Sequence, residues 1–387
     1  MIVYLDHNAT IPVSVEVLEK VFDVITKPAN PSSIHNYGRF AKGLVEGARK
    51  AIMNHLHIDA FEYDVIFTSS GTESNNHILK SLKDYHLFVP ATEHASILRC
   101  SDLFENVVFL ELDENGLVDL EKLEKIMMSF EGVEKKLFSI AYANNETGAI
   151  QNIKVIADII HKNGGILHSD MVQAFGRISF DLKDLGVDLA TISSHKIGGM
   201  QGAAAIIKKA NIKLDPILHG GQQERGFRAG TENVYAIFSF GEAVKLLPAV
   251  INNYRDVAKL RDYLEESLLS VEPEIKIYSA GCKRLPNTSY LTMPGVPHQT
   301  QVMNFDLKGF CVSSGSACSS GVVKDSHVLE AIEGEDEDRK NAIRVSLGID
   351  NTKEQIQAFI EAWKGMYLSL GKVREIADEV KLKVANL

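Results

Sequence analysis

Val187-Asp188-Leu189-Ala190-Thr191-Ile192-Ser193-Ser194-His195-Lys196-Ile197-Gly198-Gly199 is the stretch around which the rest of the chain is organised. A hydrophobic run over residues 187–192 ends in small hydroxyl residues, and one lysine follows before a glycine pair. A buried strand that delivers an amine into a pocket has this pattern. Lysine is rarely buried without a partner, so Lys196 is either an ordinary strand-end lysine that reaches water or a group that performs chemistry. The stretch alone leaves both interpretations open, because short patterns match by chance.

Strands and helices alternate on the N-terminal side of this stretch and just beyond it. Helical periodicity covers residues 13–25, 40–56, 120–128 and 155–161. Short hydrophobic runs typical of buried strands cover residues 63–67, 87–89, 107–110, 137–141, 165–168, 188–192 and 203–207. This alternation predicts an α/β fold with a mainly parallel sheet that helices cover on both faces. Ligands of such sheets bind at the carboxyl ends of the strands.

The C-terminal part of the chain has a different pattern. A helical pattern over residues 250–269 leads to short strands at 275–278, 288–292 and 342–347, and a helical tail begins at residue 353. We therefore expect a large domain of residues 14–250 and a smaller α+β domain made of residues 1–13 and 251–387. A chain of 387 residues is long enough for both.

Composition narrows the class of protein. Hydrophobic residues make up 45% and charged residues 24% of the chain, which are ordinary values for a soluble protein. The net charge of −10 opposes direct nucleic-acid binding. The N-terminus has no signal-peptide pattern, and no apolar run of membrane-spanning length is evident, so we expect a cytoplasmic protein that does not bind a membrane.

The four cysteines do not predict a metal site or a disulfide framework. Their spacing has no paired metal-binding pattern, and a chain of this size does not need disulfides; they are Cys100, Cys282, Cys311 and Cys318. The dinucleotide-binding and P-loop glycine fingerprints are also missing. We expect a reducing environment and no bound metal.

Polar side chains follow five of the predicted strands at the points where the strands end. They are Thr72, His94, Asn145, Asp170 and Lys196. Ser70 and Glu73 have the spacing of a capping box, which predicts a helix start immediately after the first of these strands. A helix N-terminus offers free amides and a positive dipole end to a phosphate, although many capped helices bind nothing.

Asp170 and Lys196 together indicate pyridoxal phosphate chemistry. The cofactor needs a lysine for a Schiff base and a carboxylate that holds the pyridinium proton. Gly71, Thr72 and Ser193 could supply donors to the phosphate, and His94 could stack on the ring or move protons. Asn145 and Gln173 offer donors to the phenolic oxygen. His94 could equally be a satisfied core histidine and Asn145 a turn residue; their joint placement at one sheet edge favours the cofactor.

Cys318 is the candidate nucleophile. It lies in a run of small residues, Ser313-Ser314-Gly315-Ser316-Ala317-Cys318-Ser319-Ser320-Gly321, which is typical of a mobile, exposed loop. An exposed thiol that can ionise is a nucleophile. Cys311 lies in a strand-like context between Phe310 and Val312, and we interpret it as a core residue.

These motifs, in this order, resemble those of the cysteine desulfurases, which are fold-type I pyridoxal-phosphate enzymes of aminotransferase class V. The resemblance runs nearly end to end. The matching segments are residues 4–10, 30–33, 72–75, 92–94, 144–148, 194–196, Arg228 with Gly230-Thr231, 313–318 and 344–348.

The resemblance implies a role for each site residue. Lys196 would carry the cofactor and move protons, and His94 would stack on the ring and act as an acid or base. Gly71, Thr72, Ser193 and His195 would hold the phosphate, Asp170 would pair with the ring nitrogen, and Gln173 with Asn145 would meet the phenolic oxygen. Arg344 would bind the substrate carboxylate, with Asn8, His35 and Asn145 in the same pocket. Thr231 would reach the phosphate of a neighbouring subunit, which implies a homodimer.

The implied reaction removes sulfur from L-cysteine. Cys318, in a loop at about 311–325, would take the sulfur as a persulfide and release alanine, and the loop resembles the long-loop subgroup. The sulfur would pass to an iron–sulfur scaffold, to tRNA thiolation or to another acceptor protein. The alternatives are a selenocysteine lyase or other class V aminotransferase-like enzyme, and a non-catalytic sulfur-relay paralogue.

Some positions depart from the family pattern. Ile11, Met171 and Met200-Gln201 replace a threonine, an alanine and a Pro-Lys pair that are common there. We expect these substitutions to affect the reaction rate and the loop geometry more than the reaction type, because every charge-bearing group is retained. An acidic run at 333–338 is interpreted as a solvated loop, with partner docking as the less favoured alternative.

Overall fold

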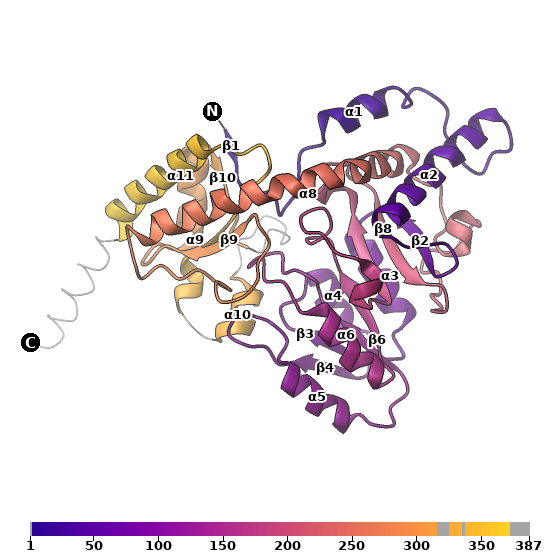
Figure 1. The fold of residues 1–387 in the computed structure, drawn as a ribbon, viewed down its shortest axis with the longest axis horizontal. Coiled ribbons are helices and arrows are strands. Elements are labelled where there is room, and N and C mark those ends of the chain that lie inside the picture. The colour runs from indigo at the N-terminus through magenta and orange to yellow at the C-terminus, as the bar shows by residue number, and fades with distance from the viewer. Residues whose placement is uncertain (1, 316–324, 335–336, 372–387) are drawn as a thin grey trace, which may run out of the picture.

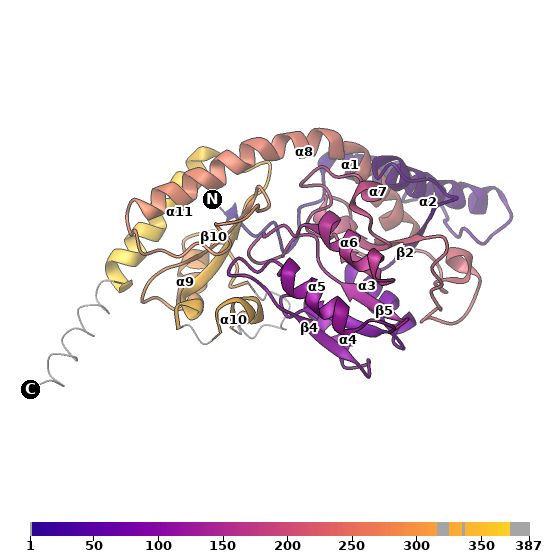
Figure 2. The same ribbon diagram turned by 60° about the horizontal axis from the view of Figure 1, so that its bottom comes forward.

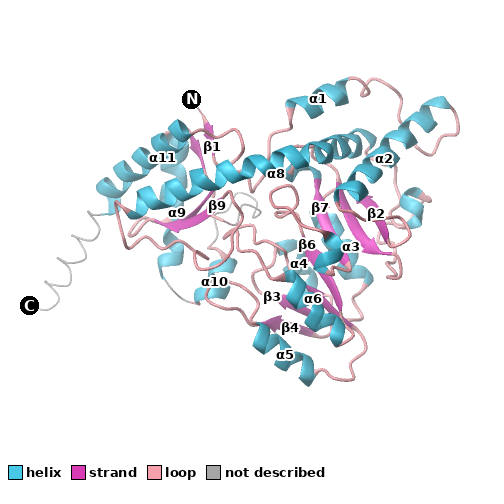
Figure 3. Cartoon of the chain, in the orientation of Figure 1, coloured by secondary structure: helices cyan, strands magenta, loops and turns pink. Residues whose placement is uncertain are grey.

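The chain forms two lobes joined by one long helix, as a computed structural model shows (Figure 1). The structure describes residues 2–315, 325–334 and 337–371. The connecting helix α8 (Val234–Leu269) runs along both lobes, and Figure 2 shows it arching over them. Figure 3 distinguishes the sheet of the larger lobe from its surrounding helices.

A seven-stranded sheet forms the centre of the larger lobe. Its order is β2 (Tyr63–Thr68), β8 (Ala204–Lys209), β7 (Leu189–Ser193), β6 (Ile166–Asp170), β5 (Lys136–Ser139), β3 (His86–Pro90) and β4 (Val107–Leu110). Strand β8 is antiparallel to both of its neighbours, and the other adjacent pairs are parallel. The prediction of a mainly parallel sheet is confirmed.

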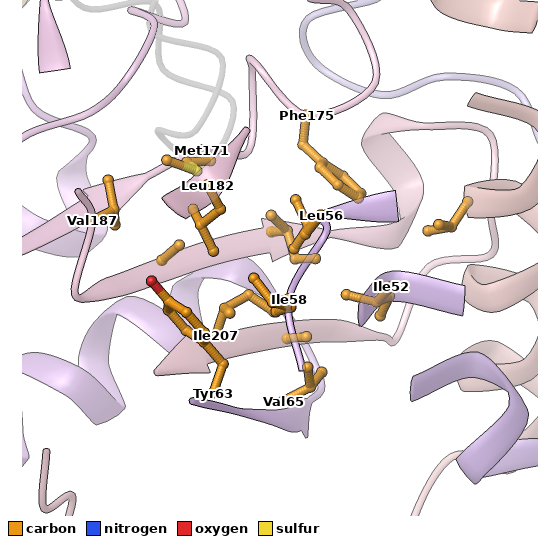
Figure 4. Packing of buried hydrophobic residues seen from close by; sticks show 14 of the residues in the cluster. Ile52, Leu56, Ile58, Tyr63, Val65, Met171, Phe175, Leu182, Val187 and Ile207 are labelled. Atoms are coloured by element: carbon orange, nitrogen blue, oxygen red, sulfur yellow. The ribbon is translucent and has the colours of Figure 1, made fainter. Parts of the chain in front are cut away.

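The strands are hydrophobic on both faces because each face packs against a separate core. In β2, Val65 and Phe67 belong to one core and Ile66 to the other. In β3, Phe88 and its neighbour Leu87 divide in the same way, as successive side chains of a strand point to opposite faces. Figure 4 shows part of the first core, where Val65, Ile207 and Met171 from the sheet region pack with Leu56 and Phe175.

Different helices cover the two faces of the sheet. Residues of α2 (Asn36–His55), α5 (Leu120–Ser129), α6 (Ile153–Lys162) and the first half of α8 belong to the first core. Residues of α3 (Gly71–Ser81) and α4 (Ala95–Ser101) belong to the second. The remaining helices of this lobe are α1 (Val15–Phe22) and the short α7 (Leu182–Leu185).

The smaller lobe is built around two short sheets. Strands β9 (Thr288–Thr292) and β11 (Ala342–Ser346) are antiparallel, while β1 (Val3–Tyr4) pairs in parallel with β10 (Phe310–Cys311). The helices of this lobe are α9 (His298–Leu307), α10 (His327–Glu333) and α11 (Lys353–Met366). The N-terminal strand therefore packs with C-terminal elements, and a core that includes Leu5, Val345 and Trp363 unites them.

Two elements differ from the sequence predictions. The helix predicted to start at residue 250 begins at Val234, so Pro248 lies inside the helix. An interior proline usually breaks a helix, but here tight packing against α2 holds the first half, with Gly241 against Ala48. The strand predicted at residues 275–278 is reduced to an isolated bridge between Ile277 and Leu291.

Helix α8 also qualifies the expectation about membranes. Within the described residues it is the single helix long and apolar enough to cross a bilayer, with a mean hydropathy of 1.6 in its most apolar window. Half of that window is buried inside the protein, which is equally the behaviour of a core helix. The helix is therefore weak evidence for membrane binding.

The two largest separate cores contain residues of different halves of α8. One contains residues between Val17 and Leu247, and the other contains Val3, Leu5 and residues from Tyr254 to Tyr367. The division at residue 250 stays a prediction. Cys318 and the centre of its predicted loop lie outside the described residues, as does the middle of the acidic run; Glu333, at the start of that run, forms an ion pair with Lys276.

Candidate active site

The ends of three strands meet at one edge of the large sheet. Asp170 ends β6 beside Thr191 of β7, and Ser193 ends β7. The register across β8 pairs Ala204 with both Ser193 and Thr68, the last residue of β2. The polar residues predicted to follow these strands therefore lie on the same edge.

Lys196 follows β7 in a single turn of 3₁₀ helix, Ser194–Lys196. Its amine donates hydrogen bonds to the backbone carbonyls of Asn8 and Ala9, the second at 2.8 Å. The side chain is half-buried, so it does not extend into water as an ordinary strand-end lysine would. The segment that crosses from the small lobe, residues 8–9, thus covers the amine.

A hydrogen-bonded chain links Asp170 to His94. The amide nitrogen Nδ2 of Asn75 lies 2.8 Å from Oδ2 of Asp170 and 2.9 Å from Oγ of Ser96. The same Oγ is 2.7 Å from Nδ1 of His94. The backbone N–H of Val172 donates to the other oxygen of Asp170 at 2.9 Å, so both carboxylate oxygens accept hydrogen bonds.

This chain fixes the tautomer of His94. The backbone N–H of Ser96 donates to Nδ1 of His94 at 3.1 Å, so Nδ1 must be an acceptor. In the neutral imidazole the proton is then on Nε2. Because Asn75 donates to Ser96, the hydroxyl of Ser96 is free to donate to His94, and every hydrogen bond in the chain has a consistent direction.

Helix α3 begins where the sequence predicts. The hydroxyl of Ser70 accepts a hydrogen bond from the backbone N–H of Glu73 at 3.1 Å. The reciprocal half of the predicted capping box does not form in this described segment, because the carboxylate of Glu73 accepts from Ser69 N–H at 2.9 Å and pairs with Arg228 at 2.8 Å.

The start of α3 fits a phosphate group. A β-carbon built on Gly71 would lie 4.0 Å from Cβ of Ser193 and 3.3 Å from Cγ2 of Val172, so a glycine keeps this space open. Oγ of Ser193 is buried and has no hydrogen-bond partner in the described part of the chain. The amides of Gly71 and Thr72 lie in the first turn, where intrahelical acceptors are lacking. A phosphate would satisfy these donors.

His195 lies next to this position as a neutral donor or acceptor. Burial, together with the positive charges of Lys196 and Arg177, lowers the pKa of His195 to about 4. Its Nδ1 lies 3.1 Å from Oγ1 of Thr10. A neutral imidazole leaves Nε2 for a further hydrogen bond.

Gln173 is held from both ends of its amide. Its Nε2 donates to the backbone carbonyl of Asn8 at 3.1 Å, and its Oε1 accepts from Arg177 at 2.8 Å. One hydrogen of Nε2 remains for another acceptor. Gln173 and Lys196 therefore share the carbonyl of Asn8 as an acceptor.

The side chain of Asn8 has structural partners in both lobes, and its role as a pocket-lining residue stays a prediction. Nδ2 donates to the carbonyl of Asn145 at 3.1 Å and to Thr288 at 2.9 Å, while Oδ1 accepts from Asn287 at 3.0 Å. Asn8 is 1% exposed. The side-chain amide of Asn145 makes no hydrogen bond to a described residue, so Asn145 is the better candidate for contact with a ligand.

Arg344 lies at the junction of the two lobes. It donates to Asp6 at 2.6 Å and to the backbone carbonyl of Asn145 at 2.9 Å, and its Nε has no partner among the described residues. The guanidinium is 2% exposed. Asp6 therefore occupies part of the surface with which Arg344 would bind a carboxylate.

Three predicted site residues lie away from this cluster or cannot be placed. His35 is exposed, and its Nδ1 accepts from Gly38 N–H at 3.3 Å at the start of α2. It makes no hydrogen bond to the sheet edge within the described chain. Thr231 is exposed beside a small cavity that Glu224 and Arg228 also line. Cys318 lies outside the described residues.

The sequence predictions missed Asn75, Asp6 and Glu93. Asn75 stands one helical turn after Gly71, so its spacing could have placed it on the same face as the phosphate site. Glu93 is fully buried, and burial raises its pKa well above the ordinary value, helped by the charge of Asp170. Its Oε1 accepts from the N–H of Ala141 at 2.7 Å. Hydrophobic periodicity carries no signal for such polar pairings.

The family departures lie in two places. Met171 is fully buried in the core beneath the sheet, where Figure 4 shows it, so it fills volume instead of facing the site. Ile11, Met200 and Gln201 line a separate cavity of about 560 Å³ with Tyr4 and Thr10.

Comparison with known proteins agrees with this arrangement. Residues 3–359 match the family Aminotransferase class-V. The chain is 36% identical over 371 residues to the cysteine desulfurase IscS of Methanosarcina thermophila, covering 93% of this chain and 90% of that protein. It is 35% identical over 394 residues to the cysteine desulfurase IscS of Dictyoglomus turgidum, covering 98% of each. A crystal structure of a NifS-like protein from Rickettsia africae superposes with a TM-score of 0.90 at 44% identity, over 95% of this chain and 99% of that one.

Proposed function

This chain belongs to the cysteine desulfurases of the aminotransferase class V family, and we propose that it removes the sulfur atom of L-cysteine and releases L-alanine. The observation that carries the proposal is the hydrogen-bonded chain from Asp170 through Asn75 and Ser96 to His94. It lies on the same sheet edge as Lys196. The carboxylate of Asp170, the imidazole of His94 and the amine of Lys196 are thereby held in defined orientations at one edge of the sheet.

The residues present fit pyridoxal phosphate. The unpartnered hydroxyl of Ser193 and the amides of Gly71 and Thr72 would hold its phosphate, together with His195. Asp170 would accept from the ring nitrogen, Lys196 would hold the cofactor covalently, and Gln173 would donate its remaining amide hydrogen to the phenolic oxygen. When bound, the cofactor supplies an electron sink for negative charge at the substrate Cα.

The substrate is oriented by polar groups from both lobes. The carboxylate of L-cysteine would bind the guanidinium of Arg344, in exchange for part of its contact with Asp6, because arginine matches a carboxylate with two parallel donors. The free side-chain amide of Asn145 lies on the residue whose carbonyl already binds Arg344. The guanidinium of Arg344 and the amide of Asn145 favour a substrate that has an α-carboxylate.

Proton movement uses two atoms with defined surroundings. Lys196 Nζ takes the α-proton of the substrate once the amine is free, and the carbonyls of Asn8 and Ala9 hold it at the sheet edge. His94 carries its proton on Nε2, because Nδ1 is an acceptor, so Nε2 can donate to the substrate. Ser96 and Asn75 keep the imidazole in this state.

Cys318 receives the sulfur. Its thiolate forms a bond to the substrate sulfur as the substrate sulfur–Cβ bond breaks, and the electron pair of the broken bond stays with the substrate carbon. That carbon gains a proton, alanine leaves, and Cys318 retains a persulfide. No external oxidant is required, since the substrate carbon is reduced as the sulfur is transferred.

Further parts of the proposal concern partners. We propose a homodimer in which the exposed Thr231 reaches a neighbouring subunit, and a reducing, cytoplasmic location. The persulfide sulfur would pass to an iron–sulfur scaffold or to a tRNA-thiolation acceptor. The names of the relatives support the enzyme activity more directly than any of these points.

The test is a comparison of cofactor attachment and product formation. Purified protein is supplied with pyridoxal phosphate, L-cysteine and a thiol reductant, and alanine is measured. In a parallel sample, borohydride fixes the cofactor before peptide mass spectrometry. We expect alanine and a cofactor adduct on Lys196. Lys196→Ala should lose both, whereas Lys162→Ala, at the exposed end of α6, should lose neither.

The same samples separate the alternative functions. Preferential release of alanine from L-selenocysteine would indicate the lyase. Formation of 3-mercaptopyruvate from L-cysteine together with a new amino acid, after a 2-oxo acid is added, would indicate transamination. A protein that stays colourless after addition of pyridoxal phosphate and forms no alanine would favour the non-catalytic paralogue and contradict the proposal.

A further inference from the structure

A further cavity lies between α2 and the middle of α8, which are side by side in Figure 1. Its volume is about 1080 Å³, and the loop at residues 177–180 closes one side. None of the described residues that line it is an aspartate or a glutamate. Its cationic wall consists of Lys50, Arg177, Lys245, Arg255, Arg261 and Arg284. Such a concentration of positive charge contrasts with a net charge of −10 for the chain.

Only part of this positive charge is neutralised within the described chain. Lys245, Arg261 and Arg284 form ion pairs with Glu242, Asp262 and Glu265. Lys50, Arg177 and Arg255 form no ion pair with a carboxylate of the described residues. Low-dielectric walls around such charges strengthen the attraction of an anion.

Arg177 is the unusual member of this group. It is 2% exposed, and it donates to neutral oxygens of Gln173 at 2.8 Å and to the carbonyl of His7 at 3.1 Å. Its Nε has no partner in the described part of the chain. Burying a cation without an opposite charge is costly, so a buried guanidinium in a cavity wall favours an anionic occupant.

The cavity also has an apolar side. Ala51, Ile178, Phe180, Val244 and Ile251 belong to its lining. We propose that this cavity binds a small molecule that carries phosphate groups beside an apolar or aromatic part, with a nucleoside polyphosphate as the representative of the class. A cavity of this size accommodates such a ligand, and a wholly polar anion would leave the apolar wall unused.

Binding of an anion in the cavity should change the surroundings of Lys196 in the candidate active site. Arg177 donates to Gln173, Gln173 donates to the carbonyl of Asn8, and that carbonyl accepts from Lys196. A phosphate that draws Arg177 toward the cavity would weaken its hold on Gln173 and alter the surroundings of Lys196. The existence of the site does not depend on the proposed desulfurase activity.

The first experiment measures binding by titration calorimetry on the full-length protein with its cofactor. The probes are ATP without magnesium, tripolyphosphate and adenosine. ATP should bind most tightly, because it meets both walls of the cavity, and its affinity should fall as salt rises. Saturable binding of adenosine that equals ATP, or no binding of either polyphosphate at millimolar concentration, would overturn the proposal.

Charge reversal then locates the site. Lys50→Glu with Arg255→Glu changes two exposed side chains of the wall, and Lys42→Glu with Lys259→Glu makes the same charge change on exposed positions of α2 and α8 outside it. We expect at least a tenfold loss of ATP affinity in the first pair and less than a twofold change in the second. Equal losses in both pairs would mean general charge attraction and contradict the site.

The link to Lys196 has its own readout. The visible absorbance of the bound cofactor is titrated against pH with and without ATP. We expect ATP to displace the midpoint in the unaltered protein and not in the Lys50→Glu/Arg255→Glu variant. A titration curve that ATP leaves unchanged while calorimetry shows binding would refute the coupling through Arg177.

Discussion

Asn75 uses both hydrogens of one amide to hold two groups of the site at once. One goes to Asp170 and the other to Ser96, whose hydroxyl contacts His94. Hydrogen bonds to charged groups are stronger than those between neutral ones, so the contact with Asp170 contributes most. The orientation of the carboxylate and the tautomer of the imidazole thus depend on a residue that need not touch the cofactor.

Replacement of Asn75 by alanine should weaken cofactor binding. Loss of a hydrogen bond to a charged group corresponds to about a 10- to 100-fold increase in the dissociation constant of pyridoxal phosphate. Fluorescence titration of the apoprotein measures this constant. Asn76→Ala is the matched control, because Asn76 donates to a neutral backbone carbonyl of Ser96 at 3.1 Å and should change the constant less than threefold. Equal effects in the two variants would contradict the role of Asn75.

At the residue scale, the sequence could identify charged groups more readily than their partners. Lys196 and Asp170 are recognisable because a charge after a buried strand is unusual. The engagement of the Asn8 side chain with Asn287 and Thr288 was not predictable, since those residues are far apart along the chain and meet only when the lobes pack. For the same reason Asp6 was not recognised as the partner of Arg344.

Helix α3 positions the predicted phosphate site through its first turn. The hydroxyl of Ser70 caps the helix, and the residues that follow, Gly71 and Thr72, lie next to Ser193. A capped helix end keeps its amides aligned, which is what an anion requires. The sequence predicted this element well because the capping residue and the hydrophobic periodicity are both local signals.

Ser70→Ala should reduce stability and cofactor affinity together. Loss of an N-cap costs about 1 kcal/mol. Thr352→Ala is the control: Thr352 caps α11 in the other lobe with a complete capping box, so its loss should lower stability by a similar amount without changing cofactor affinity. Chemical denaturation and cofactor titration measure the two effects. Unchanged affinity in Ser70→Ala would show that the end of α3 does not bind the phosphate.

Helix α8 shows where element-scale prediction failed. The helix predicted to begin at residue 250 begins at Val234, and packing of its first half against α2 maintains one helix across Pro248. Local propensity was overridden by tertiary contact, which no short window of sequence contains. The strand predicted at residues 275–278 is reduced to an isolated bridge at Ile277, because this hydrophobic run does not form a continuous hydrogen-bonded ladder with β9.

At the scale of the whole molecule, buried imidazoles make the stability of the fold depend on pH. Burial lowers the pKa of His7 and of His168 to about 4, as it does that of His195. The unfolded chain binds a proton at each imidazole below about pH 6.5, whereas the folded chain does not until about pH 4. Their contribution to stability is therefore complete above pH 6.5 and is lost as the pH falls toward 4.

The unfolding temperature should accordingly decrease between pH 6.5 and pH 4.5. Glu93 and Glu232 act in the opposite direction, because a raised pKa favours the folded state at low pH. Burial lowers the pKa of five imidazoles in the described chain, however: those of His7, His55, His77, His168 and His195. Scanning calorimetry across this range measures the slope. His168→Gln should reduce the slope, and the exposed His219→Gln should leave it unchanged. A slope that persists in full in His168→Gln would refute the assignment.

Alternation of strands and helices was sufficient to predict the α/β class and the edge of the sheet that carries the site. It could not predict the basic cavity beside α8, because Lys50, Arg177 and Arg255 come from three separate elements. The pairing of the N-terminal strand with β10 was not predicted either, although residues 1–13 were expected in the small domain. Long-range packing decides both features.

The most direct measurement is the yield of alanine and sulfide from L-cysteine under reducing conditions in Cys318→Ser, compared with the unaltered protein and with Cys282→Ser. We expect the unaltered protein and Cys282→Ser each to release alanine and sulfide in equal amounts. Cys318→Ser should release neither product and should still bind the cofactor. Undiminished alanine and sulfide from Cys318→Ser would contradict the account.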